Sequence, residues 1–154
     1  MARKIRAAVF FLLAALIWIF IFSNSVKSGP ESNAISGRVA EFLRPLLNPN
    51  GWIEERLYLK LVRKIAHFTE FGALAVCLAG AAANMEIRLG WALGLSVLTA
   101  CADETLQFFT GRTNSLKDVA IDSAGAACGI LFVYLILRII KRYRERRTWV
   151  NSDL

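Results

Sequence analysis

The chain has 154 residues, of which 56% are hydrophobic, and its formal net charge is +7. This length corresponds to one domain, and the apolar fraction exceeds the roughly 45–50% that is typical of soluble domains. The basic residues form short blocks beside long apolar runs, not one interleaved basic face, which argues against a nucleic-acid partner and favours an integral membrane protein.

Four apolar stretches each approach the roughly 20 residues that a helix needs to cross a bilayer. We therefore predict an all-α integral membrane protein in which residues 1–154 form a single membrane domain. The predicted transmembrane helices are residues 5–23, 63–84, 88–109 and 118–140, followed by a basic cytoplasmic tail over residues 141–154. The first stretch is long for a signal peptide and lacks a small-residue cleavage site, so we expect an uncleaved anchor.

The charges at the two ends of the chain predict its orientation. Arg3, Lys4 and Arg6 precede the first span, and a second basic cluster, between Arg138 and Arg147, follows the last. The positive-inside rule then places both termini in the cytoplasm, which an even number of spans permits. The long first loop has basic residues of its own, but glutamates dilute them, and we place this loop outside.

The first loop contains a helical pattern. Pro30 lies where helices commonly begin, and apolar residues recur at i, i+4, i+7 and i+11 from Ile35 onward. We predict a short amphipathic helix in this extracytoplasmic loop, on the membrane interface or capping the bundle; a soluble hairpin is the alternative. The NPNG sequence at residues 48–51 predicts a turn, after which the chain leads helically into the second span.

Polar and ionisable residues gather where the second, third and fourth spans reach the outer side. They are Lys64, His67 and Glu70 in the second span, Asp103, Glu104 and Gln107 in the third, and Arg112, Ser115, Asp118 and Asp122 in the following loop and fourth span. A charge facing lipid costs about 2.5–3.5 kcal/mol at mid-bilayer on insertion scales, so such residues normally turn inward and find partners. We therefore expect a polar cleft in the outer leaflet.

Glycines and acidic residues add detail to this prediction. The pairs Gly90/Gly94 and Gly125/Gly129 are spaced as in helices that approach one another closely.

Acidic residues outnumber fixed basic ones in the cleft, so we expect a shared proton or a bound cation. Asp118 and Asp122 are four residues apart and share a helix face, and we expect Asp118 to pair with Arg112 or with a ligand.

The order and spacing of these residues resemble the VanZ-like family of bacterial membrane proteins. The resemblance rests on Lys64-x-x-His67-x-x-Glu70-Phe71, Asp103-Glu104-x-x-Gln107-Phe108, Gly111-Arg112-x-x-Ser115-x-x-Asp118 and Gly125-x-x-x-Gly129. The chain departs from the pattern at Asp122, where the family usually has Asn. The resemblance implies a four-span, multi-pass protein of the bacterial cytoplasmic membrane, whose namesake lowers susceptibility to teicoplanin-type glycopeptides.

Three classes of function stay open at this point. In the first, Lys64, Gln107, Arg112, Ser115, Asp118 and Asp122 bind an anionic membrane lipid or lipid-linked wall precursor. In the second, the protein is an enzyme acting on such a lipid, with His67, Glu70, Asp103 and Glu104 as acid, base or Mg²⁺ ligands. In the third, it is a proton-linked small transporter or a structural partner in a larger envelope complex.

The sequence only partly discriminates among these classes. It has no activated nucleophile motif, P-loop or zinc signature, so it identifies no cofactor or metal, and self-association is left open. Each of these residues also has a purely structural interpretation. His67 and Glu70 could form a helix-surface pair, Asp103 and Glu104 could anchor the helix end at the membrane interface, and Asp118 could cap a helix. We favour binding or modification of an envelope lipid.

Overall fold

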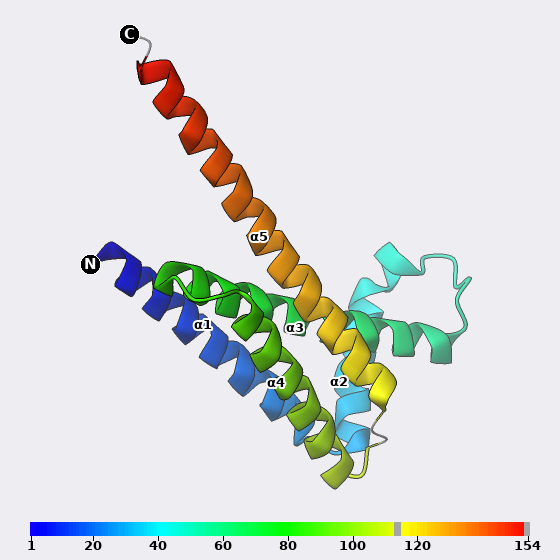
Figure 1. The fold of residues 1–154 in the computed structure, drawn as a ribbon. Helices are drawn as coiled ribbons and strands as arrows, with labels where there is room; N and C mark the ends of the chain where they lie inside the picture. The colour runs from blue at the N-terminus through cyan, green and yellow to red at the C-terminus, as the bar shows by residue number, and fades with distance from the viewer. Residues whose placement is uncertain (113–114, 153–154) are drawn as a thin grey trace.

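The computed structural model describes residues 1–112 and 115–152, which form five α-helices (Figure 1). They are α1 (Ala2–Ser25), α2 (Gly29–Leu47), α3 (Glu55–Met85), α4 (Gly90–Phe109) and α5 (Leu116–Ser152). The described ranges contain no β-strand. The all-α prediction is therefore confirmed.

Three of the helices are long and apolar enough to cross a membrane, over Ala2–Ser25, Glu55–Met85 and Leu116–Arg146. The third predicted span, residues 88–109, corresponds to α4, which is not among these three because the polar residues at its C-terminal end lower its apolar character. Helix α3 begins well before the predicted residue 63, as the helical lead-in indicated. Residues 141–152, predicted as a tail, continue α5 without a break, and this end of α5 extends beyond the other helices (Figure 1).

Helix α3 is the centre of the bundle, because it contacts each of the other four helices. Its second half is rich in alanine, and Phe71, Leu74 and Ala75 are fully buried there. The outward faces of α1 and α5 instead leave large apolar side chains exposed, such as Leu16 and Phe132. An apolar surface of this kind suits a surrounding lipid phase.

Helices α3 and α5 approach each other through glycine. A Cβ atom added at Gly125 would overlap the carbonyl oxygen of Phe68, and one added at Gly129 would overlap that of Gly72. The other predicted pair, Gly90 and Gly94 in α4, makes no such contact, since nothing lies within 4 Å of a Cβ atom added at either glycine. The expectation of close approach is thus confirmed for α5 and wrong for α4 within the described residues.

The first loop folds as a helix followed by a turn. Pro30 lies in the first turn of α2, which Ser28 and Glu31 close with a capping box. The turn after α2 has Gly51 at a φ of 66°, a conformation that glycine adopts readily. Tyr58 at the start of α3 donates its hydroxyl to the carbonyl oxygen of Ala40, 2.8 Å away, which joins α2 to α3.

Contacts between distant residues define two ends of the bundle. At one end, Arg3 of α1 forms an ion pair with Glu86, which follows α3. At the other end, Thr110 after α4 donates its hydroxyl to the carbonyl oxygen of Ser25, 3.2 Å away. The second end is therefore where α1 and α4 finish and α5 begins.

The glycine contacts lead to a stability prediction. We expect Gly129→Ala to lower the melting temperature of the purified protein in detergent, because overpacking a tight contact costs about 1–3 kcal/mol. The matched control is Gly94→Ala in α4, where the added methyl group meets no neighbour within 4 Å and alanine favours the helix. Circular dichroism during heating measures both variants; equal melting temperatures would contradict the packing described.

Candidate functional site

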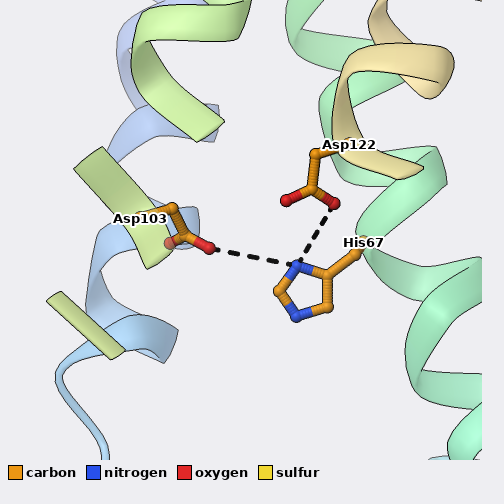
Figure 2. Close-up of side chains that lie close together, drawn as sticks. All are labelled: His67, Asp103 and Asp122. Atoms are coloured by element: carbon orange, nitrogen blue, oxygen red, sulfur yellow. Dashed lines mark ion pairs between the residues drawn. The ribbon is translucent and has the colours of Figure 1, made fainter. Parts of the chain in front are cut away.

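A cluster of one histidine and two aspartates lies between three helices at the second end of the bundle. His67 comes from α3, Asp103 from α4 and Asp122 from α5, and their side chains point toward one another (Figure 2). His67 Nδ1 lies 3.7 Å from Asp122 Oδ1 and 4.0 Å from Asp103 Oδ2. We call these three residues the His–Asp cluster.

The cluster is buried. Both aspartates have no exposed side-chain surface, and His67 retains 22%. Neither carboxylate oxygen of Asp122 has a hydrogen-bond partner among the described residues, and the same holds for Nδ1 of His67. Such atoms are rare in folded proteins, because an unpaired buried polar group costs free energy.

Asp103 differs from Asp122 because its own neighbours hold it in place. The side-chain amide of Gln107, one turn later, donates to its Oδ2 at 2.7 Å. The hydroxyl of Ser25, at the end of α1, donates to its Oδ1. These two contacts fix the direction of the Asp103 carboxylate, and they explain why Gln107 is buried together with it.

The loop from α4 to α5 binds back onto α4. The backbone N–H of Ser115 donates to Glu104 Oε2 at 3.0 Å, and the backbone N–H of Arg112 donates to the carbonyl oxygen of Gln107 at 3.0 Å. The Arg112 side chain is buried and its Nε has no hydrogen-bond partner among the described residues. Desolvation lowers the pKa of Arg112, as does the positive charge of Arg63. An anionic partner would relieve both effects.

Asp118 lies outside the His–Asp cluster although it shares a face with Asp122. It accepts a hydrogen bond from Lys64 Nζ at 2.8 Å, and both side chains are partly exposed. The predicted partner Arg112 does not pair with it, so that alternative was wrong. The pair with Lys64 forms because α3 and α5 run in close contact here.

Two cavities meet at His67. The first, of about 250 Å³, is lined by the basic residues Lys60, Arg63, Lys64 and Lys117 and by Glu104, Asp118 and Asp122, among others. The second, of about 270 Å³, has an apolar wall that includes Phe20, Ile35 and Val39, together with Lys27, Glu70 and Arg112. Arg63 and His67 line both cavities. The two cavities are therefore adjacent, with a cationic and a titratable side chain between them.

The predicted site residues thus divide into groups. His67, Asp103 and Asp122 come together, with Gln107 supporting them, and Glu104 joins Ser115 at the first cavity. Glu70 lines only the second cavity. The prediction missed Lys60 and Lys117, which line the first cavity. It also missed Arg63, whose signal is its i, i+4 spacing to His67, and Ser25, which has no signal beyond its place at the end of an apolar run.

Comparison with known proteins identifies the family to which the sequence belongs. The sequence profile of the VanZ/LLP1 family matches residues 9–138. The chain matches no curated protein and no solved structure. The matched range contains every residue of the His–Asp cluster and of both cavities, and it covers most of the chain, so the protein belongs to the VanZ-like family.

Proposed function

We propose that this protein is a four-span protein of the bacterial cytoplasmic membrane that binds an anionic envelope lipid or a lipid-linked wall precursor at its outer-leaflet end. The observation that carries this proposal is the pair of cavities that meet at Arg63 and His67. One cavity is predominantly charged and the other has an apolar wall, which matches the two halves of a lipid.

The basic residues of the first cavity suit a phosphate group. Arginine and lysine form charge-assisted hydrogen bonds with phosphate, and the planar guanidinium can do so through two N–H groups. The carboxylates of Glu104 and Asp118 line the same cavity and can accept hydrogen bonds from amine or sugar hydroxyl groups. Arg63 lies between the cavities, where the phosphate of a lipid joins its head group to its chain.

The apolar wall of the second cavity suits a hydrocarbon chain. Phe20 comes from α1, and Ile35 and Val39 come from α2. The apolar face of α2 is also exposed, with Phe42 at 84% and Leu46 at 78%. We therefore propose that α2 lies at the outer membrane interface, with this face in contact with lipid.

The burial pattern supports α4 as the additional span. Asp103, Glu104 and Gln107 lower its apolar character, yet they are only 0%, 5% and 2% exposed. Such polar groups in a membrane helix normally face the bundle interior. With four spans and basic clusters at both ends of the chain, both termini lie in the cytoplasm.

Among anionic lipids, a wall precursor is favoured by the association of the VanZ family with glycopeptide resistance. The proposed site opens at the outer-leaflet end of the bundle. A protein that binds the wall precursor at this end would change the amount of precursor that is accessible to a glycopeptide.

We expect Arg63→Gln to weaken binding of a polyprenyl phosphate about 10- to 150-fold, because a hydrogen bond to a charged group contributes about 1.5–3 kcal/mol. Native mass spectrometry of the full chain in detergent, titrated with polyprenyl phosphate and with phosphatidylcholine, measures this. Arg88→Gln is the matched control, since Arg88 is exposed between α3 and α4 and lines neither cavity. Equal lipid binding by both variants would reject the proposed site.

The orientation has its own test. In a variant whose three cysteines are replaced by alanine, we expect a new cysteine at Asn50 to react with a membrane-impermeant maleimide in intact cells. A new cysteine at Arg144 should react only after the cells are opened, because the basic end of α5 faces the cytoplasm. The reverse labelling pattern would invert the topology and place the polar site at the inner leaflet.

A further inference from the structure

We propose that His67, Asp103 and Asp122 bind one divalent transition-metal ion, of the Zn²⁺ or Mn²⁺ type. Each residue offers one ligand atom, and these atoms lie within 4.8 Å of one another. The site goes beyond the lipid-binding proposal and does not depend on it, because all three ligands belong to the chain itself and none comes from a lipid.

The distances in the His–Asp cluster fit coordination better than direct hydrogen bonding. An N–H···O hydrogen bond joins atoms about 2.7–3.2 Å apart. His67 Nδ1 lies 3.7 Å from Asp122 Oδ1 and 4.0 Å from Asp103 Oδ2. Two ligand atoms bonded at about 2.1 Å to a common ion lie about 3.4 Å apart in tetrahedral geometry and at most about 4.2 Å apart when they face each other across the ion, so both separations fall within the range that one ion can bridge.

The isolation of Asp122 is an independent indication. Its side chain is completely buried, and both of its oxygens lack a hydrogen-bond partner among the described residues. Buried charges in proteins are normally paired or coordinate a metal. One of these oxygens faces His67 Nδ1, which likewise has no hydrogen bond. An ion between the two would give partners to both.

Asp103 has the support that metal ligands usually have. Gln107 and Ser25 donate hydrogen bonds to its two oxygens, and each oxygen keeps a further lone pair. Such outer contacts orient ligating carboxylates in metal sites. The imidazole ligand then selects the metal, since nitrogen suits transition metals, whereas Mg²⁺ and Ca²⁺ prefer all-oxygen ligands.

Charged side chains from α3, α4, α5 and the loop before α5 lie around the cluster. The cavities beside it are lined by Glu70, Glu104 and Asp118 among acidic residues, and by Arg63, Lys64 and Arg112 among basic ones. Of these, Lys64 is paired with Asp118. Two buried carboxylates can lie side by side if one of them carries a proton or if both bind a metal ion. The experiment below distinguishes a proton from a metal ion.

The test is a Co²⁺ titration of the full chain, purified in detergent and treated with a chelator to remove bound metal. We expect one Co²⁺ per chain, seen by visible absorption and by elemental mass spectrometry. Zn²⁺ should displace it and Mg²⁺ should not. Asp122→Asn should weaken Co²⁺ binding at least about tenfold, since even outer-contact losses cost 10–100-fold in metal affinity.

The control for this variant is Asp118→Asn, which makes the same chemical change one turn earlier on α5, outside the His–Asp cluster. Because Asp118 is not a ligand, this change should weaken Co²⁺ binding much less than Asp122→Asn does. His67→Gln provides a second check, because loss of the nitrogen ligand should abolish the wild-type absorption spectrum in a protein whose helix content is unchanged.

The proposal is overturned if the wild-type chain binds no Co²⁺, if Mg²⁺ displaces Co²⁺ at equal concentration, or if Asp122→Asn and Asp118→Asn bind it equally. These measurements use protein without added lipid. Failure of the metal site and failure of the lipid site are therefore observed separately.

Discussion

Burial of two carboxylates and an imidazole between apolar helices is the constraint on which the rest of this structure depends. Three helices must close around the His–Asp cluster to keep it from lipid, and close packing requires small residues where α3 meets α5. Gly125 and Gly129 sit against the backbone of α3 within two turns of Asp122. The glycine contacts and the polar site are thus parts of one arrangement.

The His–Asp cluster and the two cavities beside it lie at one end of the bundle. Beyond His67, α3 continues through Leu74, Ala75 and Leu78, which are almost completely buried against apolar neighbours. The two cavities that meet at His67 involve the first half of α3 and no residue of its second half. A site open at one end suits a ligand that arrives from one face of the membrane, which favours binding over alternating-access transport.

Much of this fold follows from sequence. Apolar runs predicted the long helices, and short connections between consecutive helices bring the polar groups of α3, α4 and α5 to the same end of the bundle. Which acidic residue turns inward could not be predicted, because Asp118 and Asp122 share a helix face and the rotation of α5 against α3 decides between them. Ser25 lies 78 residues from Asp103, and no local pattern signals such a contact.

Asp122 stands where the resemblance to the VanZ-like family led us to expect Asn, and its burial gives this difference a physical meaning. An asparagine at a fully buried position is neutral and can donate a hydrogen bond as well as accept one. An aspartate of the same size only accepts when ionised, and it adds a negative charge beside Asp103. An asparagine at this position would therefore form a neutral hydrogen bond near His67, whereas the aspartate suits the proton or the cation proposed for the cluster.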